Sequence, residues 1–438
     1  MPRHLTLLVA LLAVGLTLTT CGGGPPAQDT GEPSPPPTAQ DPRTSTPAPT
    51  AEPDPPPEPP PPPSPPPPPE PVVQPAAPVR GAWVHLFDDS LKTRASIARV
   101  VQELVEADAT AIFAQVARRH DAYYTSDVLP RTPDPALEPG LDVLGELIEQ
   151  ARPAGLEVHA WVGVAPTWHH AYDGLPQPGG WLAAEHGERA PEGQRWVTRT
   201  VDGQWTDYLD PGVPEVRAHV TAVVAELAQR YPVDGIHLDY VRYNSASHGY
   251  HPAALARYQA ETGAAGTPAP ADPAWSAWRR EQTRGLVVGA RDAIAATGHD
   301  VDLSAAVITW EHGPTAGRPF EATRTYTETL QDWPGWAREG LLDAVLPMNY
   351  FRGDLPDQAR WFAEWLAFES HLAASTDTLV VPGIAGFLNP PATAVAQIEA
   401  ATQSTDGAVM YSYQQPTVDH SRGVWATLAE RVWGLPGQ

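Results

Sequence analysis

One short segment combines a carboxyl group, an imidazole and an apolar strand pattern. In Ile236-His237-Leu238-Asp239 the apolar residues alternate with the polar ones, so a strand would place His237 and Asp239 on one face. An aspartate at the end of such a strand has no packing role, and a carboxyl there is suited to general acid or base catalysis. We therefore predict that Asp239 is catalytic and that His237 shares its face.

Further candidate groups follow other apolar segments. Two more carboxylates, Glu311 and Asp121, come after the segments that end near Ile308 and Val116, and either could act with Asp239. Glycosidic bond cleavage uses such a pair, or one acid together with an assisting group of the substrate. The other residues that we predict to bind substrate are Gln115, Arg118, His159, Trp161, His237, Arg242, Tyr243, Asn349, Tyr350 and Gln414.

Tryptophan is abundant, with 15 residues, all of them beyond residue 80. An indole face stacks well on the C–H face of a sugar ring, so this content favours a carbohydrate ligand. Trp161, with Trp168 and His169 just beyond it, predicts a sugar platform.

Several classes of chemistry are a poor fit. The sequence has no HExxH motif and no cysteine available as a ligand, and the doublet His169-His170 alone is a weak metal signal, so we expect no metal and no cofactor. It also has no GxSxG elbow and no nucleotide-binding glycine motif. With 28 Lys and Arg against 52 Asp and Glu, the net charge of −24 argues against nucleic-acid binding.

The elements that must position these groups alternate strand with helix. Eight such units in roughly 360 residues predict an α/β fold, a (β/α)8 TIM barrel, in which functional groups lie at the carboxyl ends of the strands. The predicted strands are Val79–Phe87, Ala109–Val116, Leu156–Val164, Val233–Asp239, Val301–Ile308, Leu342–Tyr350, Thr378–Ile384 and Gly407–Ser412. The predicted helices are Thr93–Ala107, Leu141–Ala154, Pro214–Tyr231, Pro252–Thr262, Pro273–Thr297, Gln358–Ser375, Thr393–Thr402 and Gly423–Val432.

The N-terminal region carries export signals. Residues 1–20 have a short charged start and an apolar run of about 14 residues, too short to span a bilayer comfortably, which predicts a lipoprotein signal peptide. Cys21 follows and is the predicted lipidation site; an ordinary signal peptide with an incidental cysteine is the alternative. Residues 21–78 are rich in proline and predict a disordered linker, so the barrel occupies residues 79–438.

Six segments together resemble glycosyl-hydrolase-like family 10, the DUF187 proteins, in order along residues 79–415. They are RGAWVHL (80–86), FAQVARRHDAYYTSDVLP (113–130), GLEVHAWVGV (155–164), YLDPGVPEVR (208–217), VDGIHLDYVRYN (233–244) and QDWPGWAREGLLDAVLPMNY (331–350). The resemblance implies an exported TIM-barrel glycoside hydrolase, with some relatives linked to peptidoglycan strands that lack peptides. It places Asp239 on the family's strand-four aspartate and Asp121 on that of the strand-two loop. It also places Gln115, His159, Trp161, Arg242, Asn349 and Tyr350 on the pattern that lines the barrel mouth.

The sequence departs from that family in two places. Ala117 and Arg118 stand where relatives usually have Arg-Pro, and residues 309–318 are idiosyncratic, which leaves the role of Glu311 open. The resulting prediction is a lipid-anchored glycoside hydrolase of the cell envelope that acts on cell-wall glycan, with Asp239 as an acid. The alternatives are a non-catalytic glycan-binding lipoprotein and a hydrolase of another polysaccharide.

Overall fold

The computed structural model describes residues 77–167, 180–414 and 418–433. The predicted signal peptide, Cys21, nearly all of the linker and Trp168–His170 lie outside these residues. Among the described residues, no helix is both long and apolar enough to cross a bilayer.

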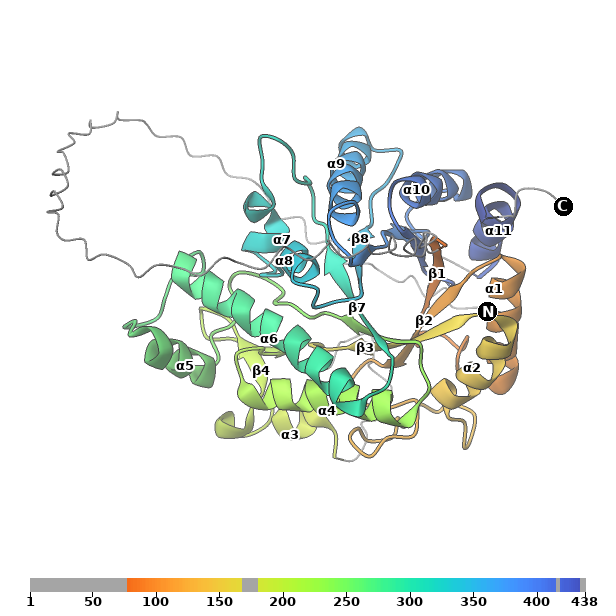
Figure 1. The fold of residues 1–438 in the computed structure, drawn as a ribbon. Helices are drawn as coiled ribbons and strands as arrows, with labels where there is room; N and C mark the ends of the chain where they lie inside the picture. Colours follow the sequence, from red (N-terminus) through yellow and green to blue (C-terminus); the bar gives the residue numbers. More distant parts are fainter. Residues whose placement is uncertain (1–76, 168–179, 415–417, 434–438) are drawn as a thin grey trace, which may run out of the picture. The chain divides into compact units, whose positions relative to one another are not determined.

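The strands form a closed parallel barrel with helices around it, as Figure 1 shows. Its strands are β1 (Val79–Val84), β2 (Ala111–Ala117), β3 (Glu157–Gly163), β6 (Gly235–Asp239), β7 (Asp302–Ile308), β8 (Ala344–Asn349), β9 (Leu379–Val380), β10 (Gly383–Ala385) and β11 (Gly407–Tyr411). The sheet closes because β1 pairs with β2 and β11, while β10 pairs with β8 and β11. The predicted (β/α)8 TIM barrel is confirmed.

The seventh strand differs from the prediction, because it consists of two short segments. β9 and β10 are separated by Val381 and Pro382, and a proline has no N–H to donate to a neighbouring strand. The carbonyl of Pro382 still accepts a 3.0 Å hydrogen bond from the Val409 N–H. The two segments therefore fill the place of a single strand between β8 and β11.

The helices are α1 (Arg94–Glu106), α2 (Val143–Ala151), α3 (Leu182–His186), α4 (Pro214–Arg230), α5 (Pro252–Thr262), α6 (Pro273–Thr297), α7 (Arg324–Thr327), α8 (Trp333–Arg338), α9 (Pro356–Ala373), α10 (Pro391–Ser404) and α11 (Val418–Leu428). α6 begins where Asp272 accepts a 2.8 Å hydrogen bond from Trp275 N–H and ends at Gly298, whose φ of 71° few other residues adopt readily. α11 begins five residues before the predicted Gly423, because a helix tolerates an internal glycine at a cost of about 1 kcal/mol.

Five short helices and strands were not predicted. The long connection after β3 contains α3 and an antiparallel hairpin of β4 (Val197–Arg199) and β5 (Trp205–Leu209). α7 and α8 lie between β7 and β8. Elements this short carry too little hydrophobic periodicity to stand out in the sequence.

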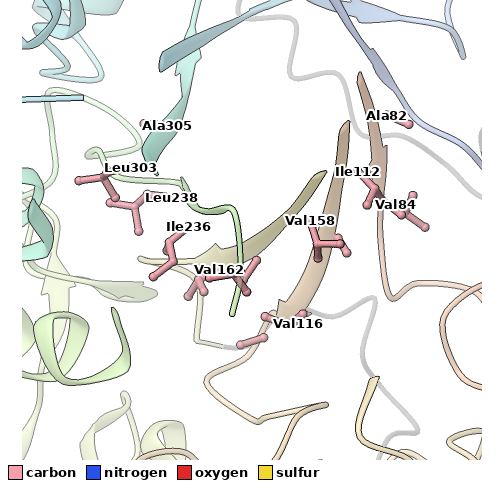
Figure 2. Packing of buried hydrophobic residues seen from close by; sticks show 14 of the residues in the cluster. Ala82, Val84, Ile112, Val116, Val158, Val162, Ile236, Leu238, Leu303 and Ala305 are labelled. Atoms are coloured by element: carbon pink, nitrogen blue, oxygen red, sulfur yellow. The ribbon is translucent and has the colours of Figure 1, made fainter. Parts of the chain in front are cut away.

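The barrel strands bury two separate cores. Their outward residues pack under the helices, and Figure 2 shows this set along neighbouring strands: Ala82, Val84, Ile112, Val116, Val158, Val162, Ile236, Leu238, Leu303 and Ala305. The inward residues form a smaller core, which comprises Trp83, Ala111, Phe113, Trp161, Ala306, Leu346, Val381 and Val409. Every second residue of a strand faces inward, so the inward set leads directly to the carboxyl end of the barrel, the barrel mouth.

Candidate active site

Asp239 ends β6 at the barrel mouth. Ile236 and Leu238 belong to the outer core, whereas the ring of His237 contacts aromatic rings of the barrel interior. Asp239 is only 7% exposed, and its Oδ1 accepts a 2.7 Å hydrogen bond from the backbone N–H of Tyr240. Tyr240 has a φ of 56°, a left-handed conformation, so the chain turns immediately after the carboxyl group.

The environment of Asp239 favours the protonated acid. Burial raises the pKa of this carboxyl from 3.8 to about 6, although the positive charge of Arg242, the Tyr240 N–H and the Trp161 indole oppose the rise. Trp161 Nε1 has no hydrogen-bond partner within bonding geometry among the described residues, so its influence on the carboxyl is electrostatic. A carboxyl that keeps a proton near pH 6 can donate it to a leaving oxygen.

Aromatic rings from other strands gather beside this acid. The rings of Tyr350, after β8, and Tyr411, at the end of β11, lie 5.5 Å apart. Phe387, after β10, lies 6.0 Å from the first ring and 5.8 Å from the second. Trp161 contacts Tyr411 edge-on at 6.4 Å. Burial first, and then the charges of Tyr411 and Asp239, raise the pKa of Tyr350, so its phenol stays protonated.

Asp239, Trp161, Arg242 and Tyr350 are thus brought together, as the sequence predicts. Phe387 was missed, because it follows the divided seventh strand, whose end the sequence pattern does not mark.

His237 lies inside the barrel, below the mouth, and both of its ring nitrogens are occupied. Trp83 Nε1 donates to His237 Nε2 over 3.0 Å, so the proton is on Nδ1, which donates to Ser304 Oγ over 2.9 Å. Burial, together with the neighbouring His159, holds the pKa of His237 well below its usual range. Its inward direction is confirmed, but its hydrogen bonds make it a support for the barrel wall.

His159 lies at the opposite end of the barrel from the mouth. Its ring stacks on Phe113 at 4.5 Å, and its Nε2 is 3.5 Å from a carboxylate oxygen of Glu157, at the start of β3. It is paired in register with Gly235, the first residue of β6. The structure therefore separates His159 from Asp239 by the length of β6, because inward residues occupy successive layers along a strand.

Three predicted binding residues hold the loop after β1. Gln115 Oε1 accepts from Leu86 N–H at 3.1 Å, and Arg118 donates to the Leu86 carbonyl at 2.7 Å. The Gln414 side chain accepts from His85 N–H at 3.4 Å and donates to the His85 carbonyl at 3.0 Å. These contacts fix the backbone of residues 85–86 and so orient the His85 side chain.

His85 is a mouth residue that sequence reasoning missed. Its ring lies 5.0 Å from Phe87 and 6.1 Å from Tyr411. Burial first, and then the charge of Arg118, lower its pKa to about 3, so the ring is neutral. Nδ1 accepts from Phe87 N–H at 3.2 Å, which leaves the proton on Nε2, and Nε2 has no partner among the described residues. Its spacing of two from the inward Trp83 was the signal that could have identified it.

The two candidate partner acids are held in ion pairs. Asp121 is fully buried and binds Arg119, also fully buried, through both of its oxygens. Glu311 is half-exposed, and its carboxylate binds Arg324 at 2.5 Å. Neither carboxylate has a contact with Asp239 among the described residues.

Two further predicted residues point away from the mouth. The Tyr243 hydroxyl donates to Asp210 Oδ1 at 3.1 Å, and this tyrosine is buried. The Asn349 amide donates to Glu369 Oε2 on α9 at 2.7 Å, on the outward face of β8. Strand alternation explains the second case, because Tyr350, one residue later, takes the inward direction.

The described residues hold no cluster of three or more side chains suited to a metal ion. A cavity of about 810 Å³ opens at the amino end of the barrel, where Asp302 and Leu379 begin β7 and β9 and Asp343 directly precedes β8. Arg291 pairs with Asp343 there at 3.2 Å, and none of the mouth residues lines it. The chemistry that the mouth supports is proton transfer by one buried acid beside a platform of aromatic rings.

Comparison with known proteins agrees with that chemistry. The sequence pattern of the family described as Glycosyl hydrolase-like 10 matches residues 78–385, more than half of the chain. Glycosyl hydrolase DigH of Escherichia coli K12 is 27% identical over 305 residues, which cover 64% of this chain and 66% of that protein. Glycosyl hydrolase YngK of Bacillus subtilis is 24% identical, over 58% of this chain and 48% of its own. The match therefore spans just under two thirds of the DigH length and about half of YngK.

Solved structures share the fold. The glycoside hydrolase domain of PgaB (BpsB) from Bordetella bronchiseptica superimposes with a TM-score of 0.53 at 15% identity, covering 79% of this chain and 98% of that domain. The catalytic domain of a β-amylase from Paenibacillus polymyxa gives 0.55 at 10% identity, covering 80% and 95%. Identities this low establish the barrel alone.

Proposed function

Because the chain belongs to the Glycosyl hydrolase-like 10 family, we propose that it hydrolyses O-glycosidic bonds with Asp239 as the general acid. One observation carries this proposal: a buried carboxyl at the barrel mouth has its pKa raised to about 6 beside the rings of Trp161 and Tyr350. The family and the shared barrel fold support a glycosidase. The substrate that we propose is cell-wall glycan, peptidoglycan strands that lack peptides.

The ion pairs of the other acids shape the proposed reaction. Asp239 donates its proton to the glycosidic oxygen, and the bond from that oxygen to the anomeric carbon breaks. Since Asp121 and Glu311 are bound to arginines, the group that attacks the anomeric carbon is the carbonyl oxygen of the substrate's own N-acetyl group. Water then opens the resulting ring and returns a proton to Asp239. This route retains the configuration at the anomeric carbon.

The same ion pairs also favour a second candidate function. A barrel with one acid and an aromatic mouth could hold glycan without cleaving it. The two functions differ in a simple way, because only hydrolysis creates new reducing ends.

The test uses the full-length chain in detergent with intact and peptide-stripped peptidoglycan, and mass spectrometry identifies the products. Wild type should release saccharides from stripped strands only. D239N should lose at least ~100-fold in rate, the usual contribution of a general acid. D377N is the matched control, because Asp377 is exposed at the amino end of the barrel.

The E311Q variant distinguishes attack by the substrate's N-acetyl group from a reaction in which Glu311 is the partner acid. Loss of activity in E311Q comparable to that in D239N would contradict assistance by the substrate and make Glu311 the partner acid. Retention of the chain on glycan without new saccharide ends would overturn hydrolysis in favour of binding.

We also propose that the protein is exported and anchored in the cell envelope by a lipid on Cys21. The apolar run before this single cysteine supports that proposal, and a proline-rich linker of about 55 residues could extend on the order of 170 Å at ~3.1 Å per residue. Cells fed a labelled fatty acid should incorporate it into the wild type and not into C21A. Label in C21A, or wild-type protein found wholly outside the membrane fraction, would contradict the anchor.

A further inference from the structure

Arg242 stands three residues after Asp239 and lies close to two aromatic rings. Its guanidinium carbon is 4.5 Å from the centre of the Tyr240 ring and 5.9 Å from that of Trp310. The residue is only 8% exposed. One of its terminal nitrogens donates to Asn244 Oδ1 at 2.6 Å, and its Nε has no hydrogen-bond partner in the part of the chain that the structure describes. Within the described residues, no carboxylate lies within 4.0 Å of this guanidinium.

A second arginine on the same ring provides a comparison. The Arg324 guanidinium lies 5.5 Å from the Trp310 ring centre and is bound by the carboxylates of Glu311 and Glu328, at 2.5 and 2.8 Å. Arg324 therefore already has carboxylate partners within the protein. Arg242, whose positive charge acts on Asp239, donates to the side-chain amide of Asn244 instead.

A buried guanidinium without a hydrogen-bonded anion is costly, and a carboxylate satisfies it best because the two groups match in a bidentate geometry. The neighbouring Tyr240 and Trp310 rings and the hydrogen bond to Asn244 restrict the guanidinium, so it is held in place before an anion binds. The mouth therefore contains a preorganised site for a planar anion next to the acid.

We propose that Arg242 binds the carboxylate of an acidic sugar adjacent to the bond that is cleaved. This inference rests on the proposed function and names the chemical class of its substrate. A sugar carboxylate has two sources: the lactyl ether of a muramic-type residue, free only where the peptide has been removed, or the C6 acid of a hexuronic acid. We favour the lactyl carboxylate, since an attached peptide would turn it into an amide, which explains a requirement for stripped strands.

Binding of that anion has a consequence for the catalytic acid. The groups that act on Asp239 are Arg242, the Tyr240 N–H and the Trp161 indole, and Tyr350 faces it as a neutral phenol. His248 interacts electrostatically with Arg242. Burial lowers the pKa of His248, so this histidine adds little charge at neutral pH. A bound carboxylate neutralises Arg242 and so offsets the positive charge that lowers the Asp239 pKa. Binding of the substrate carboxylate thereby keeps Asp239, the catalytic acid, protonated.

The experiment compares three substrates of the full-length chain: stripped strands, the same strands with the carboxyl groups reduced to alcohols, and a hexuronic-acid oligosaccharide in which the acid alternates with an N-acetylated hexosamine. Wild type should lose about 10-fold or more in kcat/KM on the reduced strands, the usual effect of a charged hydrogen bond. R242Q should cleave native and reduced strands equally, and R242K should recover part of the difference. R324Q, the matched control, should keep the wild-type preference.

The pH profile gives a second measurement that a structural role for Arg242 would not produce. On stripped strands, the alkaline limb of kcat should lie at higher pH than that of kcat/KM, because kcat reports the complex and kcat/KM the free enzyme. On reduced strands the two limbs should coincide. This measurement uses wild type, so it remains decisive if R242Q fails to fold.

Each outcome has one meaning. Equal cleavage of native and reduced strands by wild type overturns the inference and leaves the proposed hydrolysis intact. A preference that persists in R242Q overturns the assignment to Arg242. Cleavage of the hexuronic-acid oligosaccharide alone supports a carboxylate site and overturns the lactyl source. No cleavage of any strand overturns the proposed function itself.

Discussion

Replacement of Asp239 by asparagine should stabilise the protein while it removes activity. Asparagine has nearly the same shape, and its Oδ1 can still accept the hydrogen bond from Tyr240 N–H. What changes is the buried charge. An acid kept in a buried site for catalysis costs folding free energy whenever it ionises.

The magnitude follows from the pKa of Asp239, which burial raises from 3.8 to about 6. The folded-state pKa of Asp239 lies above the unfolded one. The stability that this carboxyl contributes is therefore fully present below about pH 4 and is lost as the pH rises through about 6. At ~1.4 kcal/mol per pKa unit, the loss is ~3 kcal/mol at pH 7 and ~1 kcal/mol at pH 4.5. The free energy of unfolding of D239N should therefore be ~3 kcal/mol higher than that of wild type at pH 7.

Urea denaturation followed by tryptophan fluorescence measures this difference at the two pH values. D377N serves as the control, and its exposed position predicts a change within about 0.5 kcal/mol at either pH. A gain for D239N of the same size at pH 4.5 and pH 7 would refute the reasoning, since an uncharged packing effect does not depend on pH. A loss of stability at pH 7 would refute it as well.

Three further variants test other buried groups. E369Q should stabilise the protein by roughly 3–5 kcal/mol at pH 9 and little at pH 4, since burial raises the pKa of Glu369 from 4.5 to about 8 and the stability of the wild type is lost as the pH rises from about 4.5 through about 8; urea midpoints across pH check the trend. D121N should cost roughly 3–5 kcal/mol, because it leaves Arg119 as a buried unpaired charge; full activity in the folded fraction would confirm a structural role, and its loss would indicate a catalytic one. G235A should cost roughly 1–3 kcal/mol, because its methyl group would lie 2.2 Å from His159 Nδ1; an unchanged urea midpoint would show that the ring can move aside.

The strand pattern in the sequence was sufficient to predict the barrel and the inward direction of the catalytic candidate Asp239. Alternation of Ile236 and Leu238 with polar residues places His237 and Asp239 inward, and the helices α5 and α6 have the predicted bounds. Local rules suffice here because side-chain direction in a strand depends only on the parity of the position.

Parity alone does not distinguish the two ends of a barrel or the partners across it. His159 has the inward parity but lies at the far end, and Asn349 has the outward parity and contacts Glu369. His85 has the inward parity and reaches the mouth, yet the sequence does not mark the end of its strand.

The sequence by itself thus determined that this chain forms a (β/α)8 barrel and that Asp239 stands at a strand end. Only the tertiary structure showed that Asp121 and Glu311 are bound to arginines while Arg242 lacks a carboxylate partner among the described residues. Each of these ion pairs forms within one connection between strands, after β2 and after β7, and the conformation of that connection, which strand parity does not specify, brings the charges together. A charge in the sequence therefore predicts the type of interaction, and the folded structure selects the partner.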